Sequence, residues 1–109
     1  MTSQNATERL TVVCLLRPRP EQADRLRDAL LALVTPTRAE ASCLAYDLYD
    51  DAEGSFVLFE NWRSEAELKR HQQQPAVRAL FGDRLKELLA EEMGVHYGAA
   101  LEPAAEHTT

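Results

Sequence analysis

The sequence predicts a single α+β domain built as a ferredoxin-like sandwich, with an antiparallel sheet and the element order β-α-β-β-α-α-β. Two observations predict this class. Short apolar segments rich in strand-forming residues alternate with segments whose apolar residues repeat at helical spacing. A chain of 109 residues is also long enough for one domain and no more. The folded body is expected at 10–98, between a flexible leader (1–9) and a C-terminal tail (99–109).

The first strand is expected at Leu10–Arg17, an almost continuous apolar run that suits a central strand. Pro18 stops this strand, and Pro20 fits the first turn of a following helix. Apolar residues of that helix follow the 3–4 spacing of one buried face: Ala23, Leu26, Leu30, Leu33 and Val34. Thr35-Pro36 is expected to end or kink the helix, because proline lacks the backbone N–H.

Two further strands are expected at Cys43–Asp50 and Ser55–Trp62, where an acidic turn between them forms a hairpin. Strand alternation assigns their side chains to two faces. One face is expected to carry Leu44, Tyr46, Leu48, Phe56, Leu58, Glu60 and Trp62. The other is expected to carry Cys43, Ala45, Asp47, Tyr49, Val57, Phe59 and Asn61.

A short helix should begin after Ser64, which is a plausible N-cap with Glu67 completing a capping-box pattern. This helix is expected to run to about Gln73, with Leu68 and His71 on one side. A longer helix is expected from Pro75 to about Glu91. Its apolar stripe comprises Val77, Leu80, Phe81, Leu85, Leu88 and Leu89.

The last strand is expected at Gly94–Gly98. Helices in this arrangement cover one face of the sheet, so the other face needs a cover of its own. In a chain this short a second copy can supply it, and we therefore expect a homodimer.

Charge and composition argue against several classes of protein. With 12 Lys and Arg against 18 Asp and Glu, the net charge is −6, which argues against a nucleic-acid partner. No apolar run approaches the ~20 residues of a membrane span, and no signal peptide is recognisable. Cys14 and Cys43 do not form a disulfide scaffold. These features together predict a cytoplasmic protein with no membrane partner.

His71 is the strongest candidate for chemistry, because it projects from the apolar side of a short helix. It could be a general base, since imidazole titrates near neutrality, or a core-edge histidine bonded to a backbone carbonyl. Trp62 could form a wall of a pocket or belong to the core. His96 lies in the last strand and His107 in the tail, where it is expected to be inert.

Four other residues could either contact a ligand or have only a structural role. Asn61 could orient a substrate oxygen or bind water, and Tyr46 and Tyr49 could be pocket groups or ordinary strand aromatics. Arg38 could bind an anionic group or cap the preceding helix. The residues alone leave these alternatives open.

Two segments resemble a known family. Residues 37–47 (TRAEASCLAYD) are similar to its TRAEPGCLxYDL stretch. Residues 59–62 (FENW), followed by Ala66, Leu68 and His71, are similar to its YExWxSxxALxxH stretch. In this order and spacing they resemble the antibiotic biosynthesis monooxygenase family, including its quinol monooxygenase branch, over about residues 10–97.

The resemblance implies a dimeric α/β barrel, in which two sheets pack face to face, and a pocket between sheet and helices in each subunit. It assigns Glu60, Trp62 and His71 to recurring family positions. The chain departs from the family pattern at Ala41 and Ser42, which replace the usual Pro-Gly. It also departs at Ala76, where many members have a second histidine.

The resemblance further implies an oxidoreductase that uses dioxygen to oxidise a hydroquinone or polycyclic phenol to a quinone, without metal or cofactor. In this hypothesis His71, Trp62 and Asn61 are catalytic. Substrate contacts come from Tyr46, Tyr49, Leu68, Phe81 and Arg38. Some relatives degrade haem, but Phe81 stands at the position of their iron ligand, and phenylalanine cannot coordinate iron.

Three alternatives to the oxygenase remain at this stage. The chain could be a non-catalytic protein that binds a small aromatic ligand. It could be an isomerase that uses the same base without oxygen. It could also be a structural dimer with a filled core, in which case no cavity would exist near His71.

Overall fold

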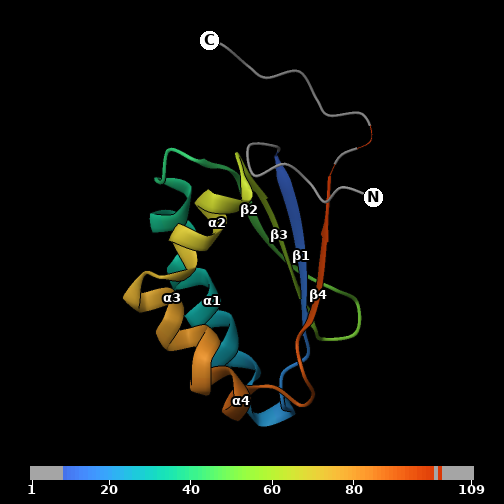
Figure 1. Cartoon of the computed structure of the whole chain (residues 1–109). Helices are drawn as coiled ribbons and strands as arrows, with labels where there is room; N and C mark the ends of the chain where they lie inside the picture. The colour runs from blue at the N-terminus through green and yellow to red at the C-terminus, as the bar shows by residue number, and fades with distance from the viewer. Residues whose placement is uncertain (1–8, 100, 102–109) are drawn as a thin grey trace.

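The computed structural model describes residues 9–99 and 101, which form a four-stranded sheet packed against a layer of helices (Figure 1). The strands are β1 (Leu10–Leu16), β2 (Cys43–Asp50), β3 (Phe56–Trp62) and β4 (Gly94–Gly98). The helices are α1 (Ala23–Arg38), α2 (Glu65–Gln72), α3 (Pro75–Ala79) and α4 (Leu85–Leu88). A 3-10 turn at Pro20–Gln22 leads into α1, and a π-type turn at Leu80–Arg84 joins α3 to α4.

The sheet is antiparallel throughout, with the order β2-β3-β1-β4. β1 lies between β3 and β4, as its continuous apolar sequence predicted. β2 and β3 form the expected hairpin, with an irregularity between Cys43 and Ala45. The α+β ferredoxin-like fold is therefore confirmed.

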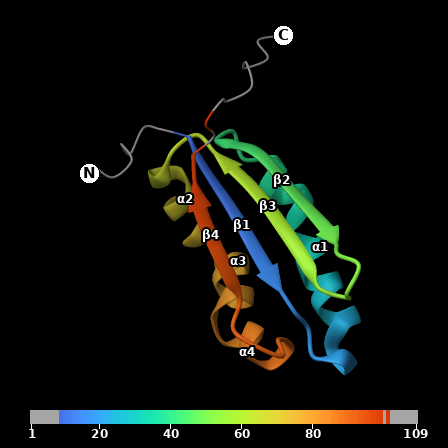
Figure 2. The same ribbon diagram turned by 90° about the vertical axis from the view of Figure 1, so that its right-hand side faces the viewer.

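All four helices lie on one face of the sheet, and Figure 2 looks onto the opposite face, where the described residues place no helix. The core lies between the two layers. Strand residues facing the helices are buried, including Val12, Leu16, Leu58 and Trp62, whereas their sequence neighbours are only partly buried or exposed. The two-residue alternation predicted for the strands is thus the pattern that the fold uses.

α1 continues through Pro36 to Arg38, so the prediction that the helix ends at Thr35-Pro36 is wrong. Pro36 lies in the last turn and is exposed, so the carbonyl group that loses its helical partner can face water. The turn is retained because Thr37 is buried against the sheet and the Ala39 N–H donates to the Thr35 carbonyl (3.2 Å).

The predicted long helix from Pro75 to Glu91 is also wrong in two respects. It is interrupted by the π-type turn, in which Gly82 has a non-helical backbone (φ −86°, ψ −125°). It ends at Leu88, because residues far away in sequence bind its end. The Arg19 N–H donates to the Leu88 carbonyl at 2.9 Å, and the Ala90 N–H donates to the Arg17 carbonyl at 2.8 Å.

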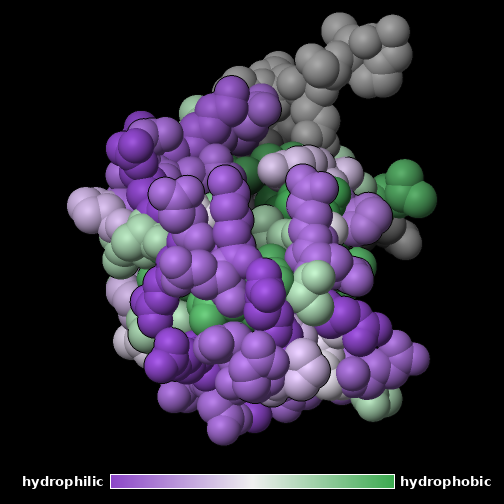
Figure 3. All heavy atoms as spheres, turned by 90° about the horizontal axis from the view of Figure 1, so that it is seen from below, coloured by the Kyte–Doolittle hydropathy of each residue, from purple (hydrophilic) through white to green (hydrophobic). Residues whose placement is uncertain are grey.

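Seen from below, the molecule is mostly hydrophilic; hydrophobic residues are visible between polar side chains and as a small group at the right-hand edge (Figure 3). None of the helices in the described part of the chain is long and apolar enough to cross a membrane. The expected leader (1–9) and tail (99–109), including His107, lie outside the described residues except for residues 9, 99 and 101.

Candidate functional site

A cavity of about 380 Å³ lies between the sheet and the α2–α3 side of the helical layer. Side chains from all four strands and from α2 and α3 line it, and most are apolar. The lining comprises Val12, Cys14, Tyr46, Glu60, Leu68, His71, Gln72, Val77, Arg78, Phe81, Gly82, Met93, Val95 and Tyr97. A largely apolar cavity with a few polar groups is the usual form of a small-molecule site.

His71 lies near the end of α2 and is buried, with 3% of its surface exposed. The helix begins where predicted, because the Ser64 hydroxyl accepts a hydrogen bond from the Glu67 N–H at 3.3 Å. Nδ1 of His71 lies 2.8 Å from Oε2 of Glu40, a residue of the loop between α1 and β2. The helix and this loop together orient the imidazole at the cavity wall.

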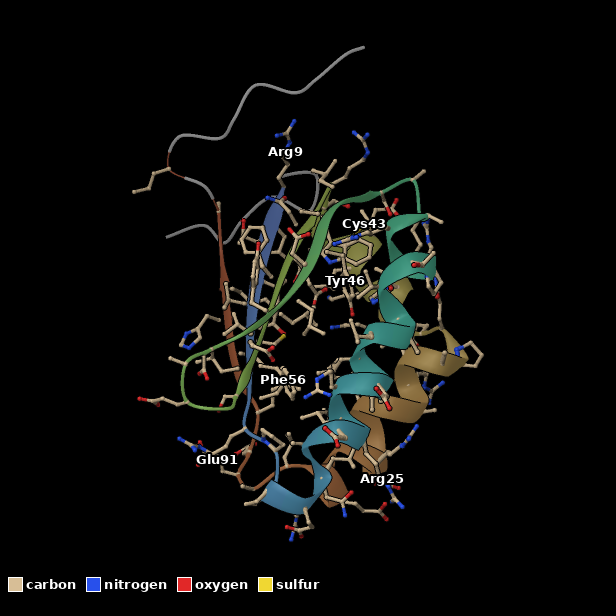
Figure 4. The ribbon with its side chains drawn as sticks, turned by 180° about the vertical axis from the view of Figure 1, so that it is seen from behind. Arg9, Arg25, Cys43, Tyr46, Phe56 and Glu91 are labelled. Carbon is tan, nitrogen blue, oxygen red and sulfur yellow. The ribbon has the colours of Figure 1, made fainter. Side chains whose placement is uncertain are left out.

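Two aromatic rings hold His71 from the sheet side. The Trp62 and His71 ring centroids are 4.6 Å apart with the planes tilted by 37°, and Tyr46 meets the imidazole edge-on at 6.0 Å. Trp62 is fully buried and supports His71 without lining the cavity. Tyr46 lines the cavity, and Figure 4 shows it in the layer between sheet and helices.

Glu60 places a buried carboxyl group in the same wall. Its Oε1 accepts a hydrogen bond from Nε1 of Trp62 at 2.9 Å, and the Cys14 thiol lies 3.8 Å from its Oε2. Burial raises the pKa of Glu60, and the Trp62 hydrogen bond and the nearby His71 oppose that rise. The site therefore contains two groups, His71 and Glu60, that can exchange protons.

Cys14 and Tyr46, two further groups of the wall, stay protonated at neutral pH. Burial, reinforced by the Glu60 carboxylate, raises the pKa of Cys14 to about 12. Burial and the same carboxylate also raise the pKa of Tyr46. Neither group is therefore suited to accept a proton from a bound ligand.

The structure brings together five of the eight residues that the sequence singled out. His71, Tyr46, Leu68 and Phe81 line the cavity, and Trp62 packs against His71. The other three lie elsewhere. Asn61 and Tyr49 lie on the uncovered face of the sheet, and Arg38 donates to the Tyr46 carbonyl and to Asp47, both at 2.9 Å.

Sequence reasoning assigned no role to Glu60 or Glu40, although both occur in the two quoted motifs. A signal was available for Glu60, because a carboxylate between Leu58 and Trp62 on an apolar strand face must be buried. No such signal existed for Glu40, whose contact with His71 joins positions 31 residues apart. Within residues 9–99 and 101, no group of three or more His, Cys, Asp or Glu side chains could hold a metal ion.

The family model described as antibiotic biosynthesis monooxygenase matches residues 9–83, a stretch that contains β1–β3, α1–α3 and the whole motif region. The chain belongs to the antibiotic biosynthesis monooxygenase family. Rv0793 of Mycobacterium tuberculosis is 40% identical over 103 residues, which cover 91% of this chain and 98% of the relative. The expectation drawn from the two motifs is thus confirmed.

Solved structures agree with this membership of the antibiotic biosynthesis monooxygenase family. The structure of Rv0793 superposes with a TM-score of 0.84 and 37% identity, and the match covers 90% of this chain and 100% of that one. PA3566 of Pseudomonas aeruginosa matches with a TM-score of 0.77 and 33% identity, over 91% and 100% of the two chains. Trp62 connects the two polar groups of the cavity wall, because it donates to Glu60 and packs against His71.

Proposed function

We propose that the protein is a monooxygenase that oxidises a hydroquinone or a polycyclic phenol to a quinone with dioxygen, without metal or flavin. One observation carries the proposal: a largely apolar cavity of about 380 Å³ has a buried histidine in its wall, fixed by a carboxylate. A dimer with a filled core would lack this cavity. Family membership supports oxygenation over the other chemistries.

The reaction balances without an external reductant, because the substrate supplies the electrons. The substrate loses two hydrogen atoms and gains one oxygen atom, so that a phenol gives a quinone and a hydroquinone gives a hydroxyquinone. The second atom of dioxygen leaves as water. Removal of the phenolic proton raises the electron density of the ring, which can then reduce dioxygen to superoxide or a bound peroxide. The peroxide collapses to quinone and water. The protein must supply a proton acceptor and a dry, shaped cavity.

His71 is the proton acceptor in this proposal, because its imidazole borders the cavity and is held in place by the Glu40 carboxylate at 2.8 Å. Leu68 and Phe81 form apolar walls for an aromatic ring, and Trp62 supports the imidazole from behind. Asn61, Tyr49 and Arg38 have no part in it, since none of them lines the cavity.

We further propose a homodimer formed through the uncovered face of the sheet. Leu15 and Tyr49 are 44% and 54% exposed, and Val57 and Phe59 lie between them on the same face. The side-chain oxygen of Asn61 is buried there with no hydrogen-bond partner among the described residues. A second copy would cover this apolar area. Free Cys14 and Cys43 fit a reducing cytoplasmic location.

Oxygen uptake with a panel of hydroquinones and polycyclic phenols, in metal-depleted buffer, tests the function. The wild-type protein is expected to consume one dioxygen per substrate and to form the quinone. His71→Ala should lower kcat/KM by about 10²–10⁴-fold, the usual contribution of a general base. Lys69→Ala is the matched control, because this side chain lies on the same helix, is 70% exposed and does not line the cavity.

Three results would contradict the proposal. Full activity of His71→Ala would remove this residue from the mechanism. Tight binding of phenols without oxygen consumption would favour a binding protein. Product formation under anaerobic conditions would favour an isomerase.

A further inference from the structure

Glu40 connects the buried imidazole to the outside of the molecule. Its side chain is 20% exposed and borders a surface hollow together with Ser42 and Glu67, whereas His71 is 3% exposed and lines the internal cavity. Oε2 of the Glu40 carboxylate lies 2.8 Å from Nδ1 of His71. Glu40 thus approaches the site from behind and does not contact a ligand in the cavity.

The hydrogen bond determines which nitrogen of His71 carries a proton. A carboxylate only accepts hydrogen bonds, so Nδ1 must be the protonated nitrogen when the imidazole is neutral. Within residues 9–99 and 101, no group hydrogen-bonds to Nε2. The second nitrogen therefore carries a lone pair on the ring that borders the cavity.

Four other titratable groups lie around His71 at the cavity wall. Tyr46 on β2 and Cys14 on β1 have raised pKa values and stay neutral. Glu60 on β3 is negative when ionised, and Arg78 on α3 is exposed at the cavity lining. Carboxyl groups thus lie on two sides of His71, Glu40 at Nδ1 and Glu60 in the cavity wall.

We propose that Glu40 is the positioning residue of His71, and that the pair selects phenols that arrive neutral and are ionised in the cavity. The phenolic proton moves to Nε2, the O–H bond breaks, and the electron pair stays on the phenolate oxygen. Glu40 stabilises the imidazolium through Nδ1–H, in the way that a carboxylate orients a catalytic histidine in hydrolases. The substrate-class part of this inference rests on the proposed function.

Two measurements that need no oxygenase activity test the pairing. In ligand-free protein, ¹⁵N NMR of His71 is expected to show the Nδ1–H tautomer, which Glu40→Gln should weaken because a glutamine amide can also donate. Under anaerobic conditions, a bound phenol should show the absorption of a phenolate in the wild type and of the neutral phenol in Glu40→Gln. Glu67→Gln is the matched control, since Glu67 borders the same hollow but pairs with Arg70 at 3.0 Å.

Oxygen-uptake kinetics then test the substrate class. Glu40→Gln should lower kcat/KM about 10²-fold for phenols with a pKa near 10, and the loss should shrink to nothing for phenols already ionised at the assay pH. An unchanged tautomer and unchanged phenol ionisation in Glu40→Gln would overturn the pairing. An equal loss for all phenols would overturn the selection of neutral phenols. Absence of oxygen uptake in the wild type would overturn the proposed function, whereas the two anaerobic readouts would still decide the role of Glu40.

Discussion

Glu60 shows how a single residue can oppose the stability of its own fold. Its carboxyl group is 6% exposed among apolar neighbours, with one hydrogen bond from Trp62 and a thiol beside it. Burial raises its pKa above the ordinary value of 4.5, so the folded protein favours the neutral acid. A carboxyl group that is buried although burial disfavours its ionised form is suited to exchange protons with a bound molecule.

The stability of the protein should therefore fall as the pH rises. Below pH 4.5 Glu60 is protonated in both the folded and unfolded states, and above that value only the unfolded chain ionises freely. Stability is lost as the pH rises from 4.5 through the raised pKa of the folded state. Glu60→Gln keeps an acceptor for Trp62 and should unfold at a higher temperature than the wild type at pH 8. Each kcal/mol gained in the free energy of unfolding should raise the unfolding temperature by roughly 4–8 °C.

Thermal unfolding between pH 2 and pH 8 checks this expectation, and the difference between wild type and Glu60→Gln should shrink toward pH 4. Asp51→Asn is the control, because the contribution of Asp51 to stability depends on pH in the opposite direction. Hydrogen bonds from the Ser55 and Glu53 N–H groups lower the pKa of the exposed Asp51, so its contribution is lost only below pH 3.8. A constant gap between wild type and Glu60→Gln at every pH would show that Glu60 does not change protonation on folding.

At the scale of the element, α2 is short and depends on its first turn. It has eight residues, and its N-terminal N–H groups are capped by the Ser64 hydroxyl. Its buried residues are Leu68 and His71, both of which line the cavity. The cap therefore supports the position of the proposed base.

Ser64→Ala should lower the free energy of unfolding by about 1 kcal/mol, because the Glu67 N–H loses its acceptor. Urea denaturation measures this loss. Ser64→Asp should retain most of the stability, since a carboxylate also accepts this bond and favours a helix N-terminus. Equal losses in both variants would show that the cap does not act through its hydrogen bond.

At the scale of the whole molecule, the two faces of the sheet differ. One face packs under four helices, and the other presents an apolar surface that no described helix covers. Leu15, Val57 and Phe59 lie together on this surface through the pairing of β1 with β3. An apolar sheet face of this kind is a site for association.

Phe59→Lys should convert the proposed dimer to a monomer, because a buried charge would face the partner without a counter-ion. Light scattering coupled to size-exclusion chromatography gives the mass directly. Leu31→Lys is the control, since Leu31 is 50% exposed on α1, in the helical layer. A wild-type monomer, or a dimer that Phe59→Lys leaves intact, would contradict an interface on this face.

The sequence by itself determined the order of helices and strands along the chain and their buried faces, because local patterns encode them. Alternation at Phe56, Leu58 and Trp62 predicted the inner face of β3, and helical spacing at Leu26, Leu30 and Leu33 predicted the buried side of α1. The two motifs identified the family before any geometry was available. Alternation and helical spacing are local patterns, and the motifs depend only on the order of residues, so all of them can be recognised without the structure.

Only the tertiary structure decided how helices end and which residues meet. α4 ends at Leu88 because Arg19, distant in sequence, binds its last carbonyl groups, and no local pattern contains that contact. In the same way, the pairing of Glu40 with His71 joins a loop to a helix across 31 positions. Asn61 and Trp62 differ by one position, yet strand alternation places them on opposite faces of the sheet, so only Trp62 supports the cavity wall.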